Sequence, residues 1–345
     1  MANDTLAQDF LPVATCFHLQ DPNFDKASQR VAINLVTAII NITTSPLAVI
    51  SNSLIVVVIF TGFRLRTPSN LLIGCLALSD MLVGLTVQPA YICFRIMENQ
   101  HHSVPCFVRV IYSNVFYICC GVAFMTLSAV SYERLVAVRL RARYNDVFSG
   151  NRVFKFMVAI WVLNVALTSL QWAGINQISR GIHFILWFLC LLVSVVASMT
   201  ICFVLRAHHH QLLTQSTISQ SIRRERELKL TRNLLFIVGI YLSLNMPVLL
   251  VSLYHQILEQ EIKTYNHYSW TETLAFLNSC TNPLLCLWKN RQIRQGIFAI
   301  GRRVTCHLGN NDETGTGVGI NRNSKRYATE INTANTAENM TTSTM

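Results

Sequence analysis

Long apolar stretches separated by short polar segments run through most of this sequence. Seven stretches reach the ~20 residues that an α-helix needs to cross a bilayer. The predicted spans cover residues 32–60, 70–94, 108–138, 153–174, 181–205, 230–256 and 267–288. The pattern therefore predicts an all-α membrane protein, folded as a seven-transmembrane helix bundle.

The composition and the placement of charge agree with a membrane protein. Only 13% of the residues are charged and 52% are hydrophobic, whereas about a quarter of a soluble domain is charged. Basic residues gather in alternate loops and after the last span, which predicts a plasma-membrane protein with its N-terminus outside and its C-terminus in the cytoplasm. Anionic lipid at the inner leaflet then explains the net charge of +11, and nucleic acid is not an expected partner.

The segments outside the spans complete the predicted organisation. Residues 1–31 form an extracellular segment with a glycosylation sequon at Asn3, and residues 32–303 form the transmembrane domain. Basic and apolar residues alternate at helical spacing over 289–301, as in an amphipathic helix on the membrane surface. Residues 304–345 are rich in Asn, Thr, Gly and Ser and are expected to be a disordered cytoplasmic tail.

Polar residues inside the spans mark candidate functional positions, because ionisable groups are costly within a membrane. Asp80 places a carboxylate near mid-bilayer, and Asn52 and Asn282 could join it in a pocket for a hydrated sodium ion. No other metal and no organic cofactor is expected. Asparagines of this kind also serve simply as hydrogen bonds between helices. Pro247 and Pro283 each remove a helical hydrogen bond, which produces either a hinge or a static bend.

These features, in this order, resemble the rhodopsin-like (class A) family of G-protein-coupled receptors over roughly residues 30–305. The matching motifs are "SNSLIVV" in the first span, "LALSD" in the second, "ERL" closing the third, Trp161, a proline in the sixth and "NP" in the seventh. A short, cysteine-free second outer loop is loosely similar to that of melanocortin receptors, within a cluster that also holds adenosine, cannabinoid and lipid receptors. The resemblance implies a receptor rather than an enzyme.

The resemblance also gives the charged pair Glu133–Arg134 a role at the inner end of the third span. It implies that Arg134 is held by Glu133 and by Glu227 at rest, and that it helps receive a heterotrimeric G protein when the sixth span moves outward. An ion pair at a helix end can bias such a two-state element. Arrestin and receptor kinases would act on the tail, where Cys306 is either palmitoylated or a free thiol. Alternatively, the pair only marks the membrane boundary.

Several family motifs are altered, and these changes leave a second function open. Tyr241 replaces the family's span-six Phe, Asn245 replaces the Trp before the proline, and Cys286 replaces the Tyr of NPxxY. A receptor-shaped decoy or scaffold that no longer switches is therefore an alternative. A transporter is disfavoured, because only Asp80 suggests one and no paired, broken spans are seen.

The family's outer disulfide cannot form here, because the short second outer loop contains no cysteine. Cys106 lies near the place of the family's span-three cysteine. In an oxidising compartment it could pair with Cys16, and Cys93 is another candidate partner.

The family's ligand-facing positions are mainly aromatic in this chain. Phe116 stands where amine receptors carry Asp, and the seventh span has no lysine for retinal, so neither ligand is expected. The candidate ligand-binding residues are Tyr112, Phe116, Tyr117, Ser252, His255 and Phe276. Such a pocket suits a neutral, lipid-like or small peptide ligand, although aromatic residues in membrane helices also serve simply to pack.

Overall fold

A computed structural model describes residues 16, 17, 19, 28–62, 65–140, 144–212, 236, 238–254 and 262–312. Within these ranges the regular secondary structure is helical, apart from an isolated bridge between Cys16 and Leu19. The chain separates into two units, residues 1–297 and 298–345. The site described below lies in the first unit.

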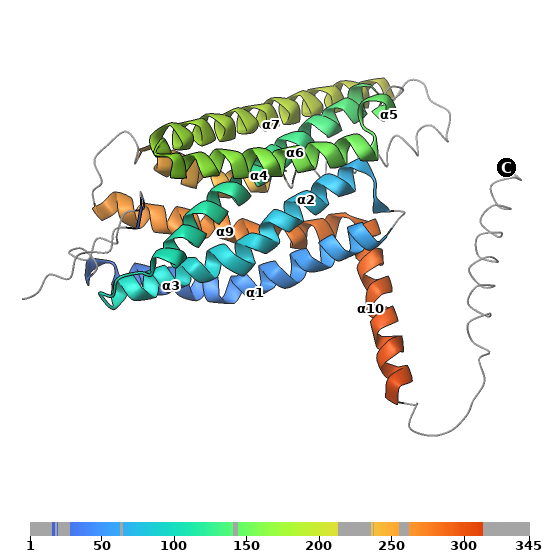
Figure 1. Cartoon of the computed structure of the whole chain (residues 1–345). Coiled ribbons are helices and arrows are strands. Elements are labelled where there is room, and N and C mark those ends of the chain that lie inside the picture. Colours follow the sequence, from blue (N-terminus) through green and yellow to red (C-terminus); the bar gives the residue numbers. More distant parts are fainter. Residues whose placement is uncertain are drawn as a thin grey trace, which may run out of the picture. The chain divides into compact units, whose positions relative to one another are not determined.

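Figure 1 shows the described helices in sequence order. The second predicted span consists of three elements, and the sixth contains an apolar helix without a label, Val238–Tyr254. The elements are α1 (Val31–Thr61), α2 (Pro68–Leu82), the π-helix η3 (Val83–Val87), α3 (Gln88–Asn99), α4 (Cys106–Arg139), α5 (Tyr144–Val147), α6 (Gly150–Ser169), the 3-10 helix η5 (Leu170–Ala173), α7 (Asn176–Leu212), α9 (Ile262–Lys289) and α10 (Arg291–Asp312).

Five helical stretches of the described chain are long and apolar enough to cross a membrane. They are Val31–Thr61, Pro68–Asn99, Cys106–Arg139, Gly150–Ala173 and Asn176–Val204. The all-helical membrane fold expected from the sequence is therefore confirmed for the described residues. The full set of seven spans stays a prediction, because the sixth helix is described only from residue 238 and α9 is less apolar.

The second span is not one regular helix, which the apolar pattern does not reveal. Its π-helix η3 ends just before Pro89, which has no N–H to donate to the carbonyl of Leu85. Ser45 of α1 donates its hydroxyl to the carbonyl of Gly84 at 2.7 Å. The irregular turn is thus held against α1 by a hydrogen bond from that helix.

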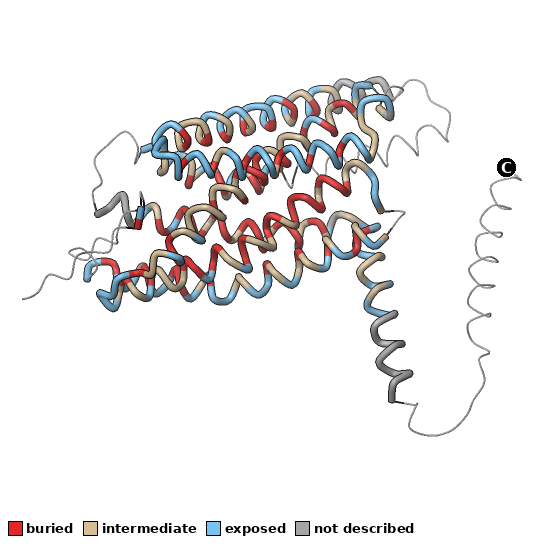
Figure 2. The backbone as a smooth tube through the Cα atoms, viewed as in Figure 1, coloured by how far each residue is buried: buried red, intermediate tan, exposed pale blue. Residues whose placement is uncertain are grey.

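Burial follows the helix faces (Figure 2). Along α7, buried Trp187, Leu191 and Ala197 alternate with exposed Phe188 and Val196. Apolar side chains on the outward face of a long apolar helix are expected where lipid rather than water is the solvent. The inward face of the helices carries the polar residues.

The centre of the structure is α4, which packs against α2, α6 and α7. The contact with α6 is unusually close at Gly121, where an added Cβ would lie 1.8 Å from Asn164 Oδ1. Only glycine fits there, because any other residue would place a carbon inside the asparagine side chain. This close approach fixes how α4 is positioned against its neighbour.

The last helix differs in length from the sequence expectation. The predicted amphipathic helix ends at residue 301, whereas α10 runs from Arg291 to Asp312. It therefore enters the segment expected to be disordered from residue 304. The glycine-rich sequence that disfavours a helix begins only after Asp312, at Gly315.

Candidate functional site

Four buried charges meet where α1 begins and α3 ends. We call Arg30, Arg95, Glu98 and Glu272 the Arg30 cluster; all four are at most 3% exposed. Arg30 Nη1 lies 2.5 Å from Glu98 Oε1. Arg95 bridges the two carboxylates, with 3.2 Å from its Nη1 to Glu98 Oε2 and 3.3 Å from its Nη2 to Glu272 Oε2. Two positive and two negative charges balance, so the cluster is neutral without any bound ion.

Neutral groups complete the Arg30 cluster from three more positions. Asn34 of α1 donates its Nδ2 to Glu98 Oε2 at 2.9 Å, and Tyr112 of α4 donates its hydroxyl to Glu272 Oε1. Arg95 also lies over the ring of Tyr91, 4.8 Å from its centroid. The cluster therefore joins α1, α3, α4 and α9.

Sequence reasoning missed this cluster almost entirely. The sequence pattern does not mark Glu98 and Glu272 as site residues, because each lies near the end of a predicted span, where a charge normally meets water. A signal did exist: Arg95 and Glu98 are three residues apart and thus share one helix face. The partner on α9 cannot be read from any local pattern.

The candidate ligand-binding residues divide between two places. Tyr112, Phe116 and Phe276 lie together with Tyr91 in one aromatic cluster directly beside the Arg30 cluster. Phe116 also contacts Tyr117, 6.1 Å between ring centroids. Among the remaining candidates, Ser252 lies half-buried on the helix Val238–Tyr254, and His255 lies outside the described residues.

Tyr117 begins a second aromatic chain, which runs between α4 and α7. It stacks on Trp187 at 5.7 Å, and Trp187 stacks on Phe124 at 5.6 Å. Phe124 then meets Tyr241 edge to face at 5.8 Å. This chain links the candidate ligand residues to the helix that carries Pro247, without the tryptophan that the family places on that helix.

The polar residues expected to surround Asp80 are brought together. Asp80 accepts hydrogen bonds of 2.9 Å from Ser279 and from Asn282, and Asn52 donates to the carbonyl of Ser279 at 2.8 Å. Asn52, Asp80 and Asn282 line a cavity of about 40 Å³, enough for a few water molecules. The Oδ1 atom of Asn282 is buried without a protein donor. An anionic carboxylate beside a free amide oxygen is a donor set that fits a hard cation such as sodium.

The charged pair of the third span lies at the opposite end of α4. Arg134 Nε is 2.6 Å from Glu133 Oε2, and Glu133 is fully buried. Glu133 also accepts hydrogen bonds from Ser69, at 2.9 Å, and from the Tyr144 hydroxyl. Burial and the nearby Glu133 charge raise the pKa of Tyr144 well above its ordinary value, so its hydroxyl stays protonated and donates. Ser69 and Tyr144 were not foreseen.

Two altered motif positions take on structural contacts. Asn245 donates its Nδ2 to the carbonyl of Tyr241, one turn earlier, at 2.9 Å. Cys286 is buried in an apolar core to which α1, α2, α4 and α6 contribute. Pro247 and Pro283 both lie inside helices.

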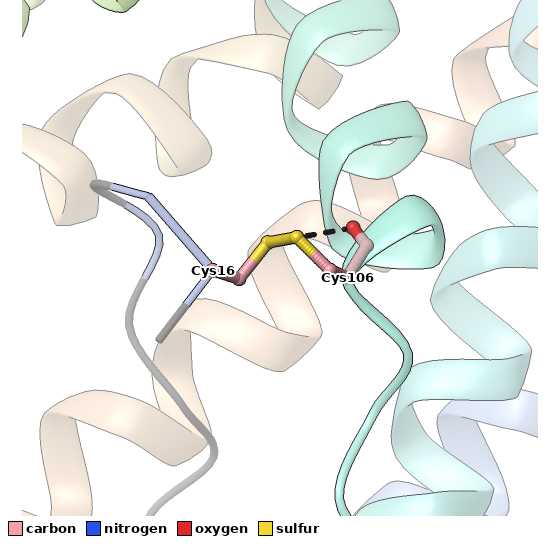
Figure 3. The surroundings of a disulfide bond; sticks show 2 residues. All are labelled: Cys16 and Cys106. Carbon is pink, nitrogen blue, oxygen red and sulfur yellow. Dashed lines mark hydrogen bonds between the residues drawn. A yellow bond between two sulfur atoms is a disulfide. The ribbon is translucent and has the colours of Figure 1, made fainter. Parts of the chain in front are cut away.

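The N-terminal segment is tied to the start of α4. Cys16 and Cys106 form a disulfide, with their Cα atoms 5.3 Å apart (Figure 3). Cys93 is a free thiol. Phe17 packs edge to face on Trp172 at 4.9 Å. The N-terminal segment therefore contacts η5, where the short second outer loop begins.

Three further candidates cannot be placed. Glu227 and Asn3 lie outside the described residues, and so does the whole connection around Glu227. Cys306 falls within α10, but nothing is described of its side chain. Their proposed roles in the resting-state ion pair, glycosylation and palmitoylation stay predictions.

Comparison with known proteins gives a consistent picture. The chain is 24% identical to adenosine receptor A2b of Rattus norvegicus over 326 residues, which cover 80% of this chain and 91% of that receptor. It is 23% identical to the histamine H2 receptor of Homo sapiens over 320 residues, 86% of each chain. A probable G-protein coupled receptor, No9, of Amphibalanus amphitrite is 30% identical over 155 residues, 45% of this chain and only 31% of that protein.

A family model extends over most of the transmembrane region. The model for the 7 transmembrane receptor (rhodopsin family) matches residues 51–285. That range contains both ends of the site, from Asp80 and Glu98 to Glu133 and Glu272. The members and relatives are receptors and not enzymes. The chain belongs to the rhodopsin family of seven-transmembrane receptors and is a multi-pass membrane protein of the plasma membrane.

Proposed function

We propose that this receptor converts binding of an extracellular ligand into activation of a heterotrimeric G protein, through outward motion of the helix Val238–Tyr254. The observation that carries the proposal is the Glu133–Arg134 pair at one end of α4, in which Glu133 is fully buried and also accepts hydrogen bonds from Ser69 and Tyr144. A buried acceptor with several donors keeps its partner arginine in place. Releasing Arg134 then requires a change in the helices around it.

The orientation in this proposal follows the basic loops. The Arg134 end faces the cytoplasm and the Arg30 end faces outward, since basic residues flank the former. The ligand then arrives beside Tyr112, Phe116 and Phe276. The two nearby carboxylates are paired with Arg30 and Arg95, so the ligand is proposed as a neutral, lipid-like or small peptide molecule, as expected from the sequence.

The cytoplasmic partners follow from the same orientation. The serine- and threonine-rich tail is the segment on which receptor kinases and arrestin would act, and α10 would lie on the inner-leaflet lipids. Sodium is proposed as an allosteric ion held by Asp80 with Asn52 and Asn282, which line one cavity. When bound, it would supply a positive charge that offsets the buried carboxylate.

A receptor-like protein that does not switch is the second candidate. It is favoured by Asn245, whose side chain bonds to its own helix, and by Cys286, which lies in apolar core. Neither side chain performs the role of the aromatic residue that the family has in its place. The aromatic chain from Tyr117 to Tyr241 favours a working switch instead, because it connects a candidate ligand residue to the helix Val238–Tyr254.

A signalling assay separates the two candidates. Basal and ligand-screened cAMP would be measured in cells expressing the chain, Arg134→Ala or Glu227→Ala, with surface expression recorded for each. The proposal expects a signal that Arg134→Ala abolishes and Glu227→Ala raises. Arg139→Ala, an exposed arginine on the same helix, is the matched control. Surface-expressed protein without any cAMP or calcium signal would favour the non-switching reading.

A further inference from the structure

Arg30 lies at a helix end, yet its whole guanidinium is enclosed. It directly precedes α1 and is only 1% exposed. Its Nη1 lies 2.5 Å from Glu98 Oε1, its Nη2 donates to Ser269 Oγ at 3.0 Å, and its Nε donates to Asn266 Oδ1 at 3.2 Å. Every nitrogen of the group thus has an acceptor, and the acceptors come from α3 and α9.

These acceptors form a cradle with the features of a recognition site. A guanidinium is planar with donors in a fixed fork, so three acceptors placed around it select for that group over an ammonium. The carboxylate of Glu98 supplies the negative charge, and the oxygens of Ser269 and Asn266 orient the guanidinium by accepting hydrogen bonds from it. We call these three residues the guanidinium cradle.

A second observation is an unsatisfied acceptor on Asn34, which is hydrogen-bonded to Glu98 of the cradle. Asn34 Nδ2 donates to Glu98 Oε2, which fixes the orientation of that amide. Its Oδ1 then has no donor, although Asn34 is completely buried. A buried oxygen without a donor is costly, and an N–H of a bound cation or a water molecule would satisfy it.

We propose that the guanidinium cradle is a cation-binding site that the receptor fills with its own Arg30, and that the ligand presents a guanidinium group to it in competition with Arg30. Arg30 precedes α1, so its side chain can leave the cradle without any helix having to unwind. Displacing it would release the link between α1, α3 and α9. The choice of ligand class rests on the proposed receptor function, whereas the existence of the site does not.

Chemical rescue of the full-length purified receptor tests the site. Arg30→Met removes the cation but keeps a long side chain, and its apparent Tm in detergent is expected to fall by about 5 °C or more, because a buried carboxylate loses its partner. Methylguanidinium chloride is the probe, and potassium chloride at equal concentration is its control. A Kd of about 1 mM is expected for this fragment, which is weaker than the affinity ceiling for its few non-hydrogen atoms, so the titration extends to roughly ten times that concentration.

The expected result is recovery of at least half of the lost Tm in Arg30→Met, with no shift in the wild type, whose site is filled. Arg30→Met/Glu98→Gln should show no recovery, because the cradle has lost its charge. Arg291→Met makes the same substitution at an exposed arginine and should neither lose Tm nor respond. If methylguanidinium does not recover the Tm of Arg30→Met, or if it raises the Tm of Arg30→Met/Glu98→Gln equally, the proposed cation-binding site is refuted.

If Arg30→Met does not accumulate, Arg30→Gln replaces it, because a neutral amide can still donate to Glu98 but leaves the cradle without a cation. The same recovery is expected, and its absence again overturns the site. The ligand class is tested on the same variant, by comparing arginine amide with citrulline amide, whose side chain is neutral and has nearly the same shape. A Tm rise with arginine amide alone supports the class, and equal effects of the two overturn it. The readout is Tm, so a failure of G-protein coupling would not imitate either result.

Discussion

The pair Arg95–Glu272 offers the sharpest test of how the Arg30 cluster works. Their side chains are 4% and 1% exposed and lie 3.3 Å apart. The cluster carries two arginines and two glutamates, so Arg95→Met leaves one uncompensated negative charge in the interior. Removing one partner of a buried ion pair costs about 3–5 kcal/mol. Glu272→Gln should cost less, about 1.5–3 kcal/mol, because Arg95 keeps Glu98 and the amide oxygen still accepts from Tyr112.

The double variant Arg95→Met/Glu272→Gln restores neutrality and should therefore be more stable than the two single losses predict. We expect a coupling of at least about 1 kcal/mol. The assay is apparent Tm in detergent at one scan rate, where about 2 °C corresponds to 1 kcal/mol for a large domain. Arg95→Met should thus lose about 6–10 °C. Strict additivity in the double variant would refute the account, because it would show that packing rather than charge balance sets the cost.

Three further predictions test other parts of the structure. Gly121→Ala should destabilise the fold by about 1–3 kcal/mol, because its Cβ would overlap Asn164; adding Asn164→Ala should recover most of the lost Tm. Cys16→Ser/Cys106→Ser should lose about 4–5 kcal/mol, since the disulfide closes a separation of 90 residues, and dithiothreitol should lower the Tm of the wild type but not of this variant. Sodium chloride should raise the Tm above that in choline chloride, and Asp80→Asn should abolish the difference; an undiminished difference in that variant would remove Asp80 from the proposed ion site.

Local sequence pattern was sufficient to predict those features that follow from contact with lipid or water. Apolar length indicated membrane-spanning helices because backbone groups in lipid must be paired within one segment. Asp80 and Glu133 could be singled out for the same reason, since an isolated charge inside an apolar run has few explanations. The motifs around them also identified the family that the comparisons then showed.

Other features were beyond any single-segment pattern. The π-helix in the second span depends on Pro89 together with a hydroxyl from α1, and the Gly121 contact depends on an asparagine in α6. The aromatic chain through Trp187 joins α4 to α7, and no spacing in either helix reveals it. Each of these requires two helices to be brought to a particular rotation and height.

The sequence by itself determined that the chain is a helical membrane protein and where its intramembrane carboxylate Asp80 and its Glu133–Arg134 pair would lie. Only the tertiary structure decided that Arg30, Arg95, Glu98 and Glu272 form one neutral, buried cluster. The reason is physical: the periodicity of a helix specifies which of its faces is apolar, but a charge near a helix end is compatible with water until another helix covers it. Whether such a charge is solvated or becomes part of a site is settled by packing.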